Sequence, residues 1–391
     1  MQKKALFLLT SLIFSLTSLS SCSSSPTKVF IPYGSLYDES KTGDELFHSI
    51  NYADLSGLMS TSSSHSFILL IRGVSDDCLC WTGLRSNLTS WMKSENAEVY
   101  LISSSEFSSN DNLGFSPVTG SNVLSIVNNG SVTYNEKIED DSSLATDSPS
   151  FASWINERVS IGKFSFISFS QLKNLYFGKD KAAFMVGFVR SSCSDCSYLL
   201  YNPLPSFLEK NTGFKQAYLF DCDVEGVRLY EGSAPSSTSE NGLLAMNQWL
   251  NFKYEYGLSS SSDNPFGYNE GYVPTFSYIL PSNIGEHGYE GIVDMAVYAN
   301  DSLASNSDGT YYVKGSYWDG SVDHDFLNDT KNLSANNVNY TNLTHLKSIP
   351  ASDVNVYEGE AYWKHEAMNK YHFPILSSFF SEYLSSSSLA K

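Results

Sequence analysis

The sequence contains an internal repeat, and this repeat constrains the fold more than any other feature. The segment Ile50–Leu58 recurs 117 residues later as Ile167–Leu175, with apolar residues at four matching positions. Each copy is predicted to begin as a short strand, to continue as a helix, and to lead into an apolar run of buried-strand length, Phe67–Ile71 or Phe184–Val189. An Arg, two cysteines, an amphipathic helix and another strand follow in both copies. This order, present twice, predicts two α/β domains.

The second copy carries two features that resemble those of thioredoxin-like proteins. The two-cysteine motif Cys193-Ser-Asp-Cys196 lies where the buried strand gives way to a helix, and Pro274 precedes the apolar strand Phe276–Leu280. A Pro is tolerated at the start of a strand because its missing N–H is not needed there. The resemblance further implies that the Val273–Pro274 peptide bond is cis and faces the cysteine pair, which makes Pro274 a candidate site residue.

The resemblance implies an α/β fold of two tandem thioredoxin-like domains, each with a mixed sheet flanked by helices. The first domain is expected over residues 28–155. The second is expected over residues 160–391, with large insertions at about 224–270 and 300–358, and its last helix is expected at His365–Leu384.

The placement of the second cysteine pair predicts redox chemistry. A thiol at a helix N-terminus faces free amide groups and the positive end of the helix dipole, so its thiolate is favoured. A second thiol within the same turn can resolve a mixed disulfide. We therefore expect Cys193 to be the nucleophile and Cys196 the resolving thiol. Arg190 is expected to lower the pKa of Cys193, and Asp195 to raise it.

Two other roles for this pair stay open on the residues alone. The same spacing occurs in structural disulfides and in one half of a four-cysteine zinc site. The other pair in the chain, Cys78 and Cys80, is one residue tighter than the usual zinc spacing, so we expect no metal and no other cofactor. Cys222 follows the strand after the motif and is a possible auxiliary thiol at the same edge of the sheet. A free, half-buried cysteine is an equal alternative.

The first copy is interpreted as a degenerate version of the second. A disulfide between Cys78 and Cys80 would close over a single residue, which predicts strain and easy reduction. The preceding Asp76 and Asp77 are expected to raise the pKa values of both thiols. Pro117 is the candidate counterpart of the cis proline, although the next strand begins several residues after it.

The second insertion is rich in Tyr, Trp, Asn and Ser. Its aromatic residues are typical of carbohydrate or protein contacts, but Tyr-rich strands that merely cover a sheet have the same composition. The acidic run Asp319–Asp325 has some character of a calcium loop, yet it lacks the Gly spacing and the later Glu of an EF-hand. We expect a solvated acidic turn there.

The first 27 residues predict export and lipid attachment. A basic start and an apolar, Ser- and Thr-containing stretch are typical of a signal peptide, expected over residues 1–21. The stretch falls short of a membrane-spanning helix. Leu19-Ser-Ser-Cys22 resembles a bacterial lipobox, which implies cleavage before Cys22 and acylation of its thiol with diacylglycerol. Palmitate is expected in the lipid anchor. Residues 22–27 would then form a lipidated tether.

Charge excludes one class of partner. The chain has 24 Lys and Arg against 42 Asp and Glu, a formal net charge of −18, and no basic cluster for phosphate contacts, so nucleic acid is not an expected partner. The sequence predicts a lipoprotein at the outer face of the cell membrane that exchanges thiols and disulfides with exported proteins. The alternative is a non-catalytic surface-binding lipoprotein that uses the thioredoxin-like fold as a scaffold.

Overall fold

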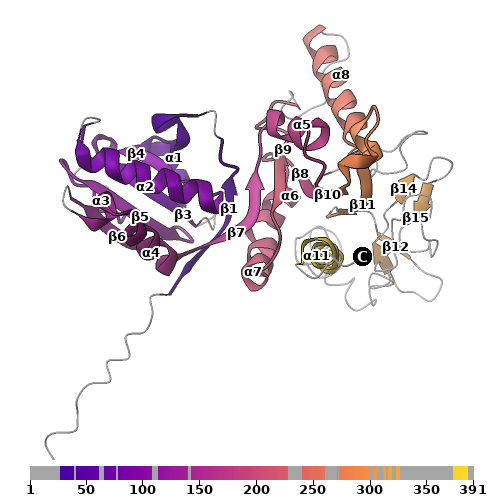
Figure 1. The fold of residues 1–391 in the computed structure, drawn as a ribbon. Coiled ribbons are helices and arrows are strands. Elements are labelled where there is room, and N and C mark those ends of the chain that lie inside the picture. The colour runs from indigo at the N-terminus through magenta and orange to yellow at the C-terminus, as the bar shows by residue number, and fades with distance from the viewer. Residues whose placement is uncertain are drawn as a thin grey trace, which may run out of the picture.

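The computed structural model describes most of both predicted domains (Figure 1). The described residues are 27–38, 41–60, 66–75, 78–107, 113–139, 142–227, 240–259, 271, 273–298 and 373–385, together with four short strands between residues 303 and 325. The predicted signal peptide, Cys22 and large parts of both predicted insertions lie outside these residues.

The first sheet has five strands whose order across the sheet differs from their order in the chain. From edge to edge they are β2 (His48–Ser49), β4 (Tyr100–Ser103), β3 (Phe67–Arg72), β5 (Asn122–Asn128) and β6 (Ser131–Ile138). The first three are parallel, whereas β5 and β6 run antiparallel to their neighbours.

Alternating side chains of β3 give this sheet a core on each face. Ile68 and Leu70 pack in one cluster with side chains of α2 (Leu79–Glu95), α3 (Ser143–Thr146) and α4 (Ser148–Arg158). Leu69 and Ile71 pack in another cluster with Leu55 of α1 (Tyr52–Met59). Both faces of the strand are covered, which explains its uninterrupted apolar sequence.

The second sheet has the same arrangement with one additional strand. Its order is β1 (Val29–Ser35), β7 (Val159–Phe166), β9 (Ala217–Asp221), β8 (Phe184–Val189), β10 (Thr275–Ile279) and β11 (Ile292–Val297). Without β1, the chain order across each sheet is first, third, second, fourth, fifth, with three parallel strands followed by two antiparallel ones. The protein therefore consists of two tandem thioredoxin-like domains, as predicted from the sequence.

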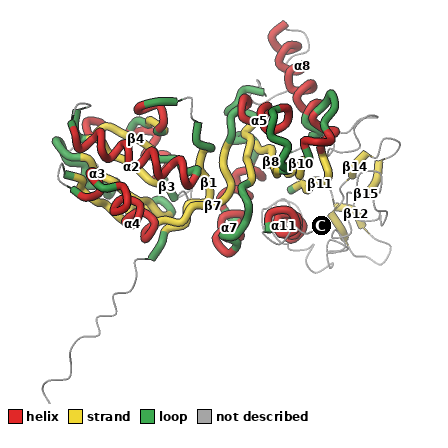
Figure 2. The backbone as a smooth tube through the Cα atoms, in the orientation of Figure 1, coloured by secondary structure: helices red, strands yellow, loops and turns green. Residues whose placement is uncertain are grey.

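The helices of the second domain lie around its sheet (Figure 2). Their buried side chains share one large apolar core with the sheet. They are α5 (Phe169–Phe177), α6 (Ser194–Tyr201), α7 (Pro203–Lys210), α8 (Glu240–Glu255) and α11 (Phe373–Leu384). The remaining described elements are the 3-10 helices η1 (Gly43–Leu46), η2 (Ser104–Glu106), η3 (Pro281–Asn283) and η4 (Gly288–Gly291), and the short strands β12 (Leu303–Ser305), β13 (Tyr311–Val313), β14 (Ser316–Trp318) and β15 (Asp323–Asp325).

The repeat recognised in the sequence places equivalent residues at equivalent positions. The backbone N–H of Ile50 donates to a carbonyl of β4 at 3.0 Å, and that of Ile167 donates to a carbonyl of β9 at 2.9 Å. The next residue, Asn51 or Ser168, then forms a capping box that starts the following helix. The predicted strands at Ile50 and Ile167 are wrong by one residue, because β2 and β7 end just before them and the caps turn the chain into a helix.

The first strand of the chain lies in the second sheet. Residues 29–35 were included in the predicted first domain, but β1 pairs in parallel with β7. Val29 and Ile31 pack in the core of the first domain, whereas Phe30 and Tyr33 pack against that of the second. Because apolar side chains alternate toward both cores, β1 joins the two domains, and a boundary read from the sequence repeat does not capture this.

Candidate active site

Cys193 lies at the start of α6, in the loop that follows the buried strand β8. It is the N-cap residue, and its Sγ accepts a hydrogen bond from the backbone N–H of Cys196 at 3.4 Å. The Sγ also lies 3.6 Å from the carbonyl oxygen of Val273, to which its thiol donates. The side chain is only partly buried, so an incoming sulfur atom can approach it.

Cys196 lies one turn into α6 and is fully buried. Its Sγ accepts a hydrogen bond from the backbone N–H of Arg190 at 3.4 Å. Burial raises the pKa of the Cys196 thiol. The hydrogen bond from that thiol lowers the pKa of Cys193 to about 7, against the opposing effects of burial and of the Asp195 carboxylate. The two thiols therefore differ: a large share of Cys193 is ionised near neutral pH, whereas Cys196 stays protonated.

The strand that faces the cysteine pair, β10, begins at Thr275, one residue earlier than expected, and it follows the cis bond that the thioredoxin-like resemblance implies. The Val273–Pro274 peptide bond is cis, and the preceding carbonyl lies beside the sulfur of Cys193. The Pro274 carbonyl accepts a hydrogen bond from the N–H of Tyr298, which anchors this segment to the end of β11. The structure thus brings together Cys193, Cys196 and the Val273–Pro274 segment.

Arg190 does not act on Cys193 in the way the sequence predicted. Its guanidinium pairs with Asp223, at 3.2 Å from Nε to Oδ1, and also donates to the hydroxyl of Ser192. Asp223 accepts further bonds from the backbone N–H and the hydroxyl of Ser192. Arg190 is therefore neutralised by a carboxylate, and the pair fixes the loop that leads into Cys193. The expected effect of Asp195 on the pKa of Cys193 is confirmed in direction.

Cys222 lies at the same end of the sheet as the dithiol but is fully buried. Its backbone N–H donates to the carbonyl of Val189, the last residue of β8, at 2.9 Å. Burial, with the carboxylates of Asp221 and Asp223, raises the pKa of its thiol. In this state Cys222 is a protonated, shielded thiol rather than a first point of attack.

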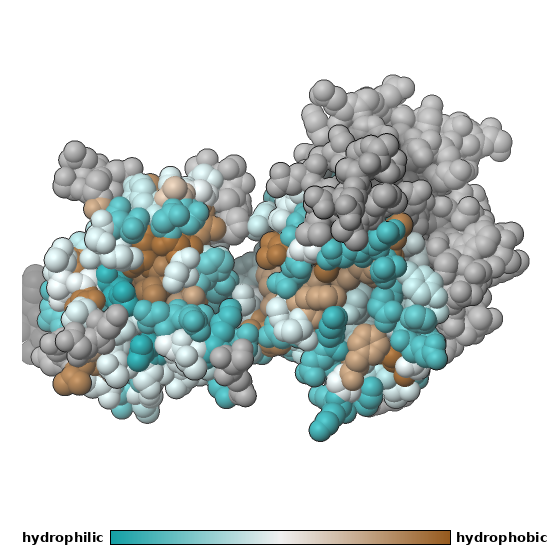
Figure 3. Space-filling model, turned by 90° about the horizontal axis from the view of Figure 1, so that it is seen from above, coloured by the Kyte–Doolittle hydropathy of each residue, from teal (hydrophilic) through white to brown (hydrophobic). Residues whose placement is uncertain are grey.

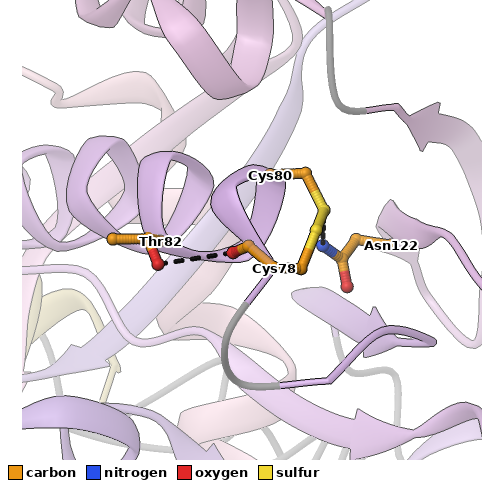
Figure 4. The surroundings of a disulfide bond; sticks show 4 residues. All are labelled: Cys78, Cys80, Thr82 and Asn122. Carbon is orange, nitrogen blue, oxygen red and sulfur yellow. Dashed lines mark hydrogen bonds between the residues drawn. A yellow bond between two sulfur atoms is a disulfide. The ribbon is translucent and has the colours of Figure 1, made fainter.

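The two cysteines of the first copy form a disulfide at the start of α2 (Figure 4). Cys78 is the N-cap residue and Cys80 is buried. The side-chain amide of Asn122 reaches the bond, with Nδ2 3.9 Å from the Sγ of Cys80. Thr82 donates its hydroxyl to the carbonyl of Cys78.

Asn122, rather than Pro117, is the counterpart of Pro274. Asn122 directly precedes the first residue of β5 that pairs with β3. Pro274 directly precedes the first residue of β10 that pairs with β8. The prediction for Pro117 is therefore wrong, because the turn after it adds residues before the strand begins. Sequence reasoning missed Asn122. The sequence feature that could have indicated it is a polar amide directly before the apolar run Val123–Val127, at the start of a buried strand.

A separate cleft lies between the two domains. It has a volume of about 1190 Å³ and an aromatic lining to which both domains contribute, including Tyr33, Phe67, Tyr100, Tyr201 and Phe207. Helix α6 contributes its last residues to this cleft, whereas Cys193 stands at the other end of that helix. On the face seen from above, apolar surface gathers in one area on each domain, bordered by polar residues (Figure 3).

Neither a metal cluster nor a membrane span is found in the part of the chain that the structure describes. No three His, Cys, Asp or Glu residues there lie close enough together to hold an ion. No helix among the same residues has the length and apolar character needed to cross a bilayer.

Comparison with known proteins gives weak structural likenesses. No protein-family model matches the chain, and no curated protein matches its sequence. Among solved structures, the zinc-bound form of human ERp44 is 10% identical with a TM-score of 0.21, over 48% of this chain and 51% of that one. The first two thioredoxin domains of Naumovozyma dairenensis Eps1p are 11% identical with a TM-score of 0.21, over 63% and 90%. The bb fragment of ERp72 is 9% identical with a TM-score of 0.23, over 48% and 81%.

The chain thus spans about half the length of the ERp44 chain that it matches. At these TM-scores the likenesses carry no argument of their own. The protein is thioredoxin-like in the strand order of its two sheets and in the position of its cysteine pair at the start of α6.

Proposed function

We propose that this protein is a thiol–disulfide oxidoreductase, anchored by lipid at the outer face of the cell membrane, that acts on disulfides of exported proteins. One observation carries the proposal: Cys193 caps a helix with its pKa lowered to about 7, and it lies 3.6 Å from the carbonyl that precedes Pro274. A partly exposed thiolate and a buried thiol one turn away are the two groups that disulfide exchange requires.

The reaction follows from this geometry in two balanced steps. The Cys193 thiolate attacks one sulfur of a substrate disulfide, forming a mixed disulfide and releasing the other substrate sulfur as a thiolate. Cys196 then loses its proton and attacks the Cys193 sulfur, which releases the second substrate thiolate and leaves a Cys193–Cys196 disulfide. The substrate gains two electrons and the protein loses two. The reverse sequence oxidises a substrate dithiol.

The export and anchoring part of the proposal is supported by the sequence of the first 27 residues. Labelling with a palmitate analogue in a bacterial host is expected to mark the full chain, and Cys22→Ser is expected to abolish the label. An unlabelled wild-type chain would leave the oxidoreductase proposal standing but remove the anchor.

The catalytic part is tested by trapping. In the full chain, Cys196→Ala is expected to accumulate mixed disulfides with exported proteins, because the second step is lost. The double variant Cys193→Ala/Cys196→Ala is expected to lose the capture at the second domain, and Cys222→Ala is the matched control for loss of a buried thiol. If Cys196→Ala captures no more than the double variant does, the non-catalytic binding alternative is favoured.

A further inference from the structure

The first domain carries a disulfide at the position where the second domain carries its dithiol. Cys78 caps α2, a helix of 17 residues, and Cys193 caps α6. In both domains the second cysteine is buried behind the first. The Cys78–Cys80 disulfide of the first domain therefore occupies the position that the reactive dithiol occupies in the second domain.

Part of this disulfide is accessible among the described residues. Leu79, the single residue between the two cysteines, is 86% exposed, and Cys78 is only partly buried. An exposed apolar side chain beside a reachable sulfur offers a contact for an apolar segment of another protein. An attacking thiolate would meet Cys78 first, with Cys80 as the leaving group.

Asn122 supplies the group that a leaving Cys80 needs. Its Nδ2 lies 3.9 Å from the Cys80 sulfur, and its Oδ1 is buried with no hydrogen-bond partner among the described residues (Figure 4). A thiolate accepts a much stronger hydrogen bond from an amide than a disulfide sulfur does. Rotation of the amide would instead let Oδ1 accept from a protonated thiol. In the oxidised state Nδ2 has only this long contact to a disulfide sulfur, and Oδ1 has no partner among the described residues. The reduced state would offer Nδ2 a thiolate, or Oδ1 a thiol proton.

We propose that Cys78–Cys80 is a second exchange centre, which donates its disulfide to a peptide or protein segment that carries two thiols. One substrate thiolate attacks Cys78 and displaces the Cys80 thiolate, forming a mixed disulfide. The second substrate thiolate then attacks the substrate sulfur of that bond and displaces the Cys78 thiolate. The substrate leaves as a disulfide with two electrons fewer, and the first domain holds two thiols. This role is independent of the function proposed for Cys193.

The test uses the full chain with Cys193→Ala and Cys196→Ala, so that exchange at the first domain is measured alone. A synthetic peptide with two cysteines and apolar neighbours is the dithiol, and mass spectrometry after alkylation follows both partners. The expected result is one peptide disulfide formed for each Cys78–Cys80 bond consumed, with repeated turnover when glutathione disulfide is added. The control variant, which also has Cys78→Ala and Cys80→Ala, should give only the background rate.

The role of Asn122 is tested with Asn122→Leu, which keeps the volume and removes the amide. Loss of a hydrogen bond to a developing thiolate should slow reduction of the Cys78–Cys80 bond about tenfold, while circular dichroism shows an unchanged fold. A bond that survives excess peptide dithiol and excess dithiothreitol in the natively folded chain would overturn the proposal and assign the bond a structural role. An unchanged rate in Asn122→Leu would overturn the part assigned to the amide.

Discussion

The two domains share a fold but differ at the point where the second strand gives way to a helix. In the second domain this point holds a dithiol facing a cis proline, and in the first it holds a disulfide contacted by an asparagine amide. The arginine at the end of each of these strands is paired with a carboxylate in both domains: Arg72, the last residue of β3, with Asp44, and Arg190, directly after β8, with Asp223. The two domains therefore share strand order and helix caps, which define the fold. They differ in the cysteine spacing and in the residue that faces the cysteines, which decide the sulfur chemistry.

The largest expected effect separates the two centres by activity. Cys193→Ala should lower the rate at which the reduced full chain reduces a reporter protein disulfide by roughly a thousandfold or more, because the nucleophile is lost. Cys78→Ala/Cys80→Ala should keep that rate within about twofold. Stopped-flow fluorescence of the reporter measures both. Equal losses in the two variants would contradict the division of roles.

The second effect concerns a buried carboxyl that is found in the second domain. Burial raises the pKa of Asp294 to about 7, and its Oδ2 accepts a hydrogen bond from the hydroxyl of Tyr383 on α11. The folded chain therefore holds this proton over a pH range in which the unfolded chain has released it, from about 4 upward. The folded state binds more protons there, so this carboxyl's contribution to the free energy of unfolding falls as the pH rises from about 4 to 7.

The expected slope is on the order of 1.4 kcal/mol per pH unit within that window. Urea titrations at several pH values measure it, with Asp294→Asn as the matched variant that cannot titrate. The difference in stability between wild type and variant should change with pH in this direction. A difference that stays constant from pH 4 to 7 would show that the carboxyl is not protonated in the fold.

The third effect is a packing difference at one position of the central strand. Gly187 of β8 lies opposite Phe276, whereas Leu70 of β3 lies opposite Leu124. A Cβ on Gly187 would clash with the Phe276 ring. Gly187→Ala should therefore destabilise the second domain by about 1–3 kcal/mol. Thermal unfolding measures this, and an unchanged midpoint would mean that the ring moves aside freely.

The smallest effect is the pH dependence of alkylation. Because the thiolate is the reactive form, alkylation of Cys193 by iodoacetamide should rise with pH around a midpoint of about 7. Cys222 is buried and should stay unmodified in the folded chain. Peptide mass spectrometry separates the two sites. A midpoint near 9 would show that Cys193 is an ordinary thiol, with no greater reactivity than a structural cysteine.

The sequence predicted the fold because the apolar pattern of the repeat is a property of single strands and helices. The same pattern did not predict that β1 joins the second sheet, since its alternating side chains suit either core. The roles of Cys193 and Cys196 could be predicted because both residues were expected at the N-terminus of a helix. The pattern missed Asn122 and the Arg190–Asp223 pair, because these depend on which residues the register of two sheets brings together. Cys22 and its lipid remain a prediction.

The central claim is that the second domain holds an exchange-competent dithiol. The most direct test is a glutathione redox titration of Cys193 and Cys196 in the full chain with Cys78→Ala and Cys80→Ala, followed by alkylation and mass spectrometry. We expect a reduction potential between about −270 and −120 mV, the range from thioredoxin to strongly oxidising members of the fold. A bond that resists reduction, with a potential below about −300 mV, would contradict it and assign the pair a structural role.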